Sequence, residues 1–153
     1  MKKILTIFLL ILLPLCSFGQ KKNNKVSQKV IKFKDNVDLP LTSKEKLQID
    51  EVYGEYAEKY VYNDSHRLKA IKHLLRNRVE IKKIGEEENK KPYVLLSKIP
   101  LNTAFVKDLK RDSNFNANDF NPLKYNFNLF TKNGGMYRVD GTNTYIIIKS
   151  QYQ

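Results

Sequence analysis

Residues 125–149 read YNFNLFTKNGGMYRVDGTNTYIIIK and carry the strongest strand signals of the chain. Apolar and polar side chains alternate from Tyr125 to Leu129, which is the pattern of a strand with one buried face. Asn-Gly-Gly at 133–135 and Asp-Gly at 140–141 are typical of tight turns between strands. The β-branched run at 144–149 favours a strand that is central or buried on both faces. The stretch therefore predicts a C-terminal three-stranded antiparallel meander.

Two further strands are predicted upstream. From about Val79 the apolar period changes from helical to alternating, which indicates the start of one strand. Residues 92–99 form an apolar run that we interpret as a buried strand, ended by Pro100. Residues 101–123 are irregular and rich in Asn and Asp, so we expect a long loop. Its expected anchors on the core are three aromatic residues: Phe105, Phe115 and Phe120.

Two amphipathic helices precede the strands. Thr42 and Glu45 have capping-box spacing, in which each side chain satisfies a backbone N–H at the helix start. Asn-Asp-Ser at 63–65 offers an N-cap for the second helix. The first helix is acidic and the second is basic, which predicts an antiparallel pair with complementary charge. The apolar positions are Ile49, Val52, Tyr53, Tyr56, Ala57 and Tyr60 in the first helix, and Leu68, Ile71, Leu74, Leu75 and Val79 in the second.

The predicted fold class is α+β, in a single domain over residues 42–150. We expect a helical hairpin packed on one face of an antiparallel sheet of about four to six strands. Residues 20–41 contain six Lys and two Asp, which gives them a net charge of +4. We interpret them as a basic linker or a loosely docked arm.

The first 19 residues have the organisation of a bacterial-type secretory signal. A cationic start at Lys2-Lys3 is followed by an apolar run from Ile4 to Leu13, and a small-residue exit precedes Gln20. The run is too short to span a bilayer, so we expect cleavage, with a secreted or periplasmic product and no transmembrane helix in the mature chain. The alternative is an envelope lipoprotein anchored at Cys16, although Leu15 stands where such signals have a small residue.

Removing the first 19 of the 153 residues leaves 134 and lowers the formal charge from +12 to +10. Cys16 is the only cysteine, so the mature chain has no thiol. This excludes disulfides, cysteine nucleophiles and cysteine-based zinc sites. The chain also lacks the glycine-rich phosphate loops and serine-hydrolase motifs, so we predict no cofactor and no catalytic residue. Glu86-Glu87-Glu88 lacks the alternating oxygen ligands of a calcium loop, and we interpret it as a solvated turn.

His66 and His73 are the only histidines and lie two turns apart on the predicted second helix. One hypothesis is a secreted basic hydrolase of the nuclease or toxin type, in which both imidazoles act on one phosphodiester. The competing interpretation, which we favour, is two surface histidines on a basic helix face. For metal, no third ligand follows Asp64 and His66 at a recognisable spacing.

The second helix also carries a possible patch for an anionic partner. Lys greatly outnumbers Arg in this chain, and Lys is a poorer fork for phosphate, so we do not expect nucleic acid. An envelope protein, a glycan or an anionic surface fits the basic helix and the abundant Tyr and Asn better. We therefore expect an exported, non-catalytic protein with a binding or structural role. The patch residues are Arg67, Lys69, Lys72, Arg76 and Arg78.

Overall fold

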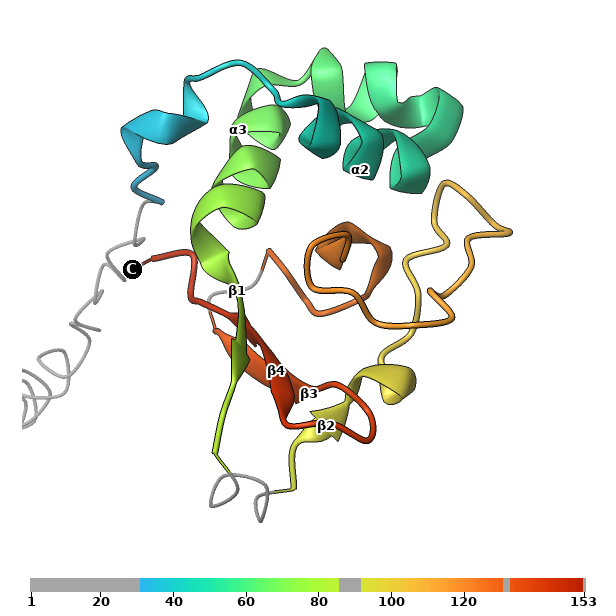
Figure 1. Ribbon diagram of the computed structural model, residues 1–153. Helices are drawn as coiled ribbons and strands as arrows, with labels where there is room; N and C mark the ends of the chain where they lie inside the picture. The colour runs from blue at the N-terminus through green and yellow to red at the C-terminus, as the bar shows by residue number, and fades with distance from the viewer. Residues whose placement is uncertain (1–30, 86–91, 131–132, 153) are drawn as a thin grey trace, which may run out of the picture.

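The computed structural model describes residues 31–85, 92–130 and 133–152. They form an α+β fold in which helices lie above a four-stranded mixed sheet (Figure 1). The expectations for residues 1–30 and for Glu86-Glu87-Glu88 fall outside the described residues. Within the described part of the chain, no helix is long and apolar enough to cross a membrane. The principal elements are α2 (Ser43–Tyr53), α3 (Ser65–His73), β1 (Val79–Lys83), β2 (Val94–Leu95), β3 (Gly135–Arg138) and β4 (Thr144–Ile148).

Helix α2 begins with the predicted capping box. The Thr42 side chain accepts from the Glu45 N–H at 3.2 Å, and the Glu45 carboxylate accepts from the Thr42 N–H at 2.8 Å. Ile49, Val52 and Tyr53 are buried and form the inner face of the helix. The helix ends at Gly54, whose φ of 52° and ψ of −133° suit glycine.

Helix α3 begins at the predicted N-cap, where the Asp64 side chain accepts from the Arg67 N–H at 2.9 Å. Ile71 is completely buried in its core face. The helix continues as a wider π-type turn over Leu74–Arg78 and passes directly into β1 at Val79. The predicted change of period at Val79 is confirmed.

The sheet has the strand order β1-β4-β3-β2. Strand β4 pairs antiparallel with β1 and β3, so the prediction of a central final strand is confirmed. A turn at Asp140-Gly141 joins β3 to β4, and Gly141 has a φ of +66°. Strand β2 pairs with β3 in parallel, so the sheet is mixed and not wholly antiparallel. Parallel partners come from distant parts of the chain, and no local turn signals such a pairing.

Two strand predictions are wrong in detail. Within residues 125–129 the only pairing is a single bridge between Leu101 and Tyr125, so the meander has two strands and not three. The rings of Tyr125 and Phe127 instead stack, 5.5 Å apart, inside the hydrophobic core. Residues 92–99 contribute only the two-residue edge strand β2, followed by a 3-10 turn. In both segments the apolar pattern indicated buried residues, but most of these residues lie in loops and turns and not in strands.

Residues 35–40 pack against α3, as the arm interpretation allowed. Asp35–Val37 forms a 3-10 turn, and Val37 is buried. The ammonium group of Lys72 donates to the carbonyls of Val37 and Leu39 at 3.0 and 2.7 Å. Asn36 and Asn77 form a reciprocal pair of amide hydrogen bonds, each 2.9 Å long. The end of the expected arm is therefore part of the folded domain.

Candidate functional site

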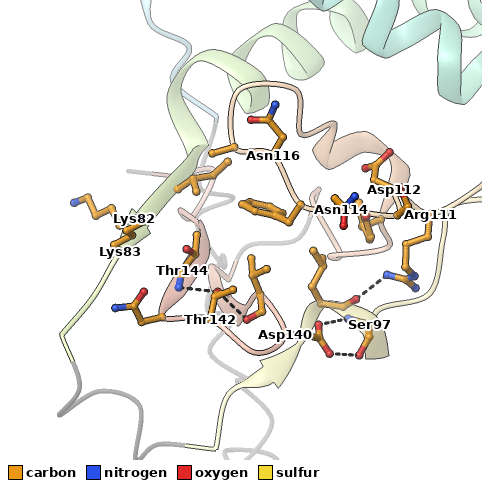
Figure 2. Close-up of a pocket in the computed structure, with 18 residues that line it drawn as sticks. Lys82, Lys83, Ser97, Arg111, Asp112, Asn114, Asn116, Asp140, Thr142 and Thr144 are labelled. Carbon is orange, nitrogen blue, oxygen red and sulfur yellow. Dashed lines mark hydrogen bonds between the residues drawn. The ribbon is translucent and has the colours of Figure 1, made fainter.

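An open cleft of about 900 Å³ lies beside the sheet. One side is formed by the ends of β1 and β4, and the other by the loop at 111–117 (Figure 2). Leu96, Tyr125 and Val139 are buried and line its apolar floor, and Phe115 is half-buried. Cavities of this volume hold small organic ligands, and most such sites are apolar with a few polar groups.

The loop at 111–117 is held in place by Lys124, whose side chain is buried. Lys124 donates to Asp112 at 2.5 Å and pairs with Glu51 of α2 at 2.9 Å. Burial alone would lower the pKa of Lys124, but the hydrogen bonds and charges of Asp112 and Glu51 outweigh it and raise that pKa. Asn121 adds a second connection to α2 by donating to the Gln48 carbonyl at 2.9 Å. The wall of the cleft is thus fixed to the helix layer.

Arg111 and Asp140 hold in place the segment at residues 96–99 that contributes to the floor of the cleft. Arg111 donates to the carbonyls of Leu96 and Ile99 at 2.8 and 2.7 Å, and its guanidinium lies 5.2 Å from the centre of the Tyr125 ring. Asp140 accepts from the N–H and hydroxyl of Ser97 (Figure 2). The Ser97 hydroxyl hydrogen bond is the main reason why the pKa of Asp140 is lowered. These charged groups therefore stabilise the floor of the cleft.

Three exposed, uncharged polar side chains of the lining form no hydrogen bond within the described structure. They are Ser113 and Asn114 of the loop and Asn143 of the turn between β3 and β4. The backbone of Asn143 is fixed, because its carbonyl accepts from the Ile84 N–H at 3.0 Å. Side-chain amides and hydroxyls each donate and accept hydrogen bonds, so these residues are available to a ligand.

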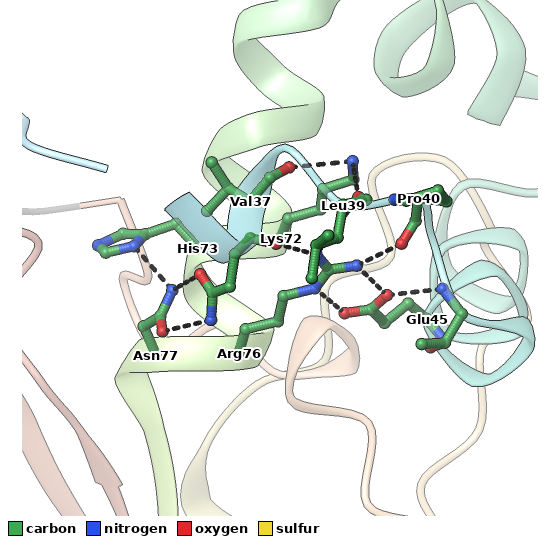
Figure 3. Close-up of polar contacts among 10 residues, drawn as sticks. Val37, Leu39, Pro40, Glu45, Lys72, His73, Arg76 and Asn77 are labelled. Atoms are coloured by element: carbon green, nitrogen blue, oxygen red, sulfur yellow. Dashed lines mark hydrogen bonds and ion pairs between the residues drawn. The ribbon is translucent and has the colours of Figure 1, made fainter. Parts of the chain in front are cut away.

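The five cations predicted as an anion-binding patch have partners inside the protein. Lys72 and Arg76 hold residues 36–40, and Arg76 also pairs with Glu45 (Figure 3). Arg78 is buried and donates to the carbonyls of Lys149 and Leu129 at 2.8 and 2.6 Å. The remaining two are Arg67, which donates to the Tyr53 hydroxyl and covers the Phe130 ring, and Lys69, which pairs with Asp38. Anion binding at this helix stays a prediction.

The two histidines lie outside the cleft and are separated by an aromatic ring. Phe33 contacts both imidazoles edge-on, with ring centroids 5.9 Å from His66 and 5.5 Å from His73. His66 is exposed, but His73 is buried, so the interpretation of two surface histidines is wrong for His73. Burial, followed by the charges of Arg78 and Lys34, lowers the pKa of His73. The geometry therefore places a hydrophobic ring where a shared phosphate would have to bind.

Phe115 is one of the expected anchors of the long loop, but no sequence pattern predicts the cleft itself. Asn114 and Asn143 are ordinary loop residues in the sequence, and long-range packing brings their segments to one cleft. Among the described residues, no group of three or more His, Cys, Asp or Glu side chains is placed to hold a metal ion. No protein-family model, curated protein or solved structure matches this chain. The geometry of the cleft is therefore the main guide to the role of this protein.

Proposed function

We propose that this protein is exported and acts without catalysis, by binding a ligand in the cleft beside the sheet. The observation that carries the proposal is the combination of an apolar floor with the unbonded side chains of Ser113, Asn114 and Asn143. The cleft has a fixed wall and floor, and rigid walls reduce the ordering cost of binding. In this proposal, α2 and α3 form the helical hairpin that supports the cleft.

The charged side chains of the lining favour binding over catalysis. A general acid or base must be within hydrogen-bond reach of a reacting group. Asp112 accepts a hydrogen bond from Lys124, and Asp140 accepts one from Ser97. Neither histidine lines the cleft. The hydrolase hypothesis with His66 and His73 therefore receives no support from the positions of these residues.

Export is supported by the sequence pattern at residues 1–19 and is tested by mass. The full chain is produced in a bacterial host with its own N-terminus, the cells are fractionated, and the intact mass is measured. We expect a chain that begins at Gln20 in the periplasm or the medium. A diacylated chain that begins at Cys16 would establish the lipoprotein alternative. The uncleaved 18.0-kDa chain in the cytoplasm would contradict export.

Ligand binding is tested by fragment screening with nuclear magnetic resonance. Mixtures of small neutral compounds are added to the ¹⁵N-labelled protein, and the shifted amide signals are mapped. We expect the shifts to cluster around Asn114, Phe115 and Asn143. The variant Asn143→Trp places a large side chain at the cleft and should remove these shifts, whereas Asn63→Trp, an exposed site outside the cleft, should keep them. Shifts confined to other surfaces would contradict the proposal.

A further inference from the structure

The two carboxylates and the guanidinium of the lining have partners inside the protein, and of the two exposed lysines of β1 Lys82 pairs with Glu80, while Lys83 has no ion pair among the described residues. Asp112 is bonded to Lys124, Asp140 accepts from Ser97 at 2.9 Å, and Arg111 donates to two backbone carbonyls. A charged ligand would have to compete with these bonds, and breaking a partly buried pair is costly. A ligand without net charge avoids this competition. These three groups therefore favour a neutral ligand over one that would bind them through charge.

The polar groups that remain match a ligand that carries many hydroxyls. Asn114 and Asn143 belong to two different segments of the lining, and Ser113 adds a hydroxyl. Each Asn amide donates through its NH₂ group and accepts through its oxygen. Neighbouring hydroxyl groups also donate and accept, so each amide is able to bond two of them. This complementarity is weaker for a ligand that has only acceptors or only donors.

The apolar part of the lining matches the C–H face of a sugar ring. The half-buried Phe115 ring packs against the Phe120 ring, with centroids 5.4 Å apart, and this contact holds it in the cleft. The face of an aromatic ring is electronegative and attracts the weakly positive hydrogens of C–H groups. Ile81 and Val139 extend the apolar surface beside it. One wall of the cleft thus offers stacking, and its polar residues offer hydrogen bonds.

We propose that the cleft binds a neutral oligosaccharide. This inference rests on the proposed function and specifies its ligand class. A cavity of about 900 Å³ lies near the upper end of the range for small-molecule sites, which allows about two or three sugar rings. Phe115 stacks on one ring, and Asn114 and Asn143 bond its hydroxyls.

An extended peptide is the competing class, because β1 is an edge strand and lines the same cleft. A peptide would add to the unpaired backbone of this edge. However, Lys82 and Lys83 are exposed on β1, and charged side chains on an edge discourage the addition of a strand. The edge therefore favours the saccharide over the peptide.

The test compares defined probes on the ¹⁵N-labelled protein. The neutral probes are maltotriose, cellotriose, chitotriose and mannotriose. A five-residue peptide of alternating Val and Thr with blocked ends represents the strand class, and trigalacturonate represents acidic sugars. Variants Asn114→Ala, Asn143→Ala and Phe115→Leu alter the proposed contacts. Asn63→Ala is the matched control, because Asn63 is exposed and lies outside the lining.

We expect at least one neutral trisaccharide to shift the signals of Asn114, Phe115 and Asn143. Loss of either Asn side chain should weaken its affinity about tenfold, as for one lost hydrogen bond, and Asn63→Ala should leave it unchanged. Cleft shifts with only the peptide or only trigalacturonate would overturn the saccharide inference and leave the binding function standing. If neither these probes nor the fragment mixtures shift cleft signals, both proposals are overturned.

Discussion

Arg76 and Glu45 form a two-bond ion pair between the π-type turn that follows α3 and the start of α2. The Nε–Oε1 distance is 2.5 Å and the Nη2–Oε2 distance is 2.6 Å. The same carboxylate accepts from the Thr42 N–H, so one side chain caps α2 and joins the two helices (Figure 3). Arg76 also donates to the carbonyls of Asn36 and Pro40. A single pair thus connects both helices and the segment that precedes them.

We expect Glu45→Gln to destabilise the protein by about 2–4 kcal/mol, because it leaves a largely buried guanidinium without its counter-charge. The two side chains are only 13% and 10% exposed, so water compensates little for the loss. Urea unfolding followed by circular dichroism gives the free energy. Glu55→Gln is the control, since Glu55 is exposed, and it should change stability by less than about 0.5 kcal/mol. Equal stability of the two variants would show that the pair contributes nothing net.

Lys72 should contribute more to stability than Lys69, although both lie on α3. Lys72 is 7% exposed and donates to two carbonyls of the preceding segment, whereas Lys69 forms an exposed pair with Asp38. We expect Lys72→Met to cost about 1–3 kcal/mol by leaving the buried Val37 carbonyl unsatisfied, and Lys69→Met to cost much less. Hydrogen exchange should show that only Lys72→Met loses protection at residues 37–39. Similar exchange in both variants would contradict the assignment of Lys72 as the anchor.

His73 should make stability depend on pH below about 6.5, the usual pKa of histidine. Its Nδ1 lies 3.2 Å from the Asn77 amide, while Nε2 is buried without a partner among the described residues. Burial lowers the pKa of His73 in the folded protein. Below pH 6.5 the imidazole of His73 therefore binds a proton in the unfolded chain but remains neutral in the folded chain. Stability therefore falls as the pH drops from 6.5 towards the folded pKa, and then levels.

The check is urea unfolding of His73→Gln and the wild type between pH 5 and pH 7.5. We expect the variant to lose the part of the pH dependence that begins near 6.5, because glutamine does not titrate. The exposed His66, changed to Gln, serves as the control and should retain this dependence. Loss of this dependence in the His66 variant, or an unchanged slope in the His73 variant, would contradict the assignment.

Gly54 and Gly141 both have positive φ but differ in the space around them. A Cβ at Gly54 would lie 3.1 Å from Val106 Cγ2, whereas a Cβ at Gly141 would meet nothing within 4 Å. We expect Gly141→Ala to cost about 1–2 kcal/mol from backbone strain alone, and Gly54→Ala to cost more. Gly85→Ala, which has neither constraint, should be close to neutral. Thermal unfolding of the three variants should give this order, and a smaller loss at Gly54 than at Gly141 would contradict it.

Local signals predicted the elements whose hydrogen bonds are local. The capping box at Thr42, the N-cap at Asp64 and the β3–β4 hairpin around Asp140-Gly141 all involve residues that are close in the chain. The start of β1 at Val79 followed from a change in apolar period. Such features depend on nearby residues and are retained in many tertiary contexts. They were sufficient to establish the α+β class.

The candidate site depended on long-range contacts that no local pattern encodes. Asn114, Asn143 and Phe115 come from loops, and the loop that carries Asn114 and Phe115 is held by distant contacts such as that of Lys124 with Asp112. The cations of α3 and of the π-type turn that follows it show the same limit. A helical pattern identified their common element, but only packing determined that Lys72 and Arg76 would face backbone carbonyls.

The sequence by itself determined the helix starts, the helix-to-strand transition at Val79 and the central position of β4. Only the tertiary structure decided that Tyr125 and Phe127 enter the core from a loop and that β2 joins β3 in parallel. The physical reason is that hydrophobic burial is not directional, so an apolar run specifies that a segment is buried but not which partner buries it. Hydrogen-bond partners and the cleft follow only when distant segments have packed together.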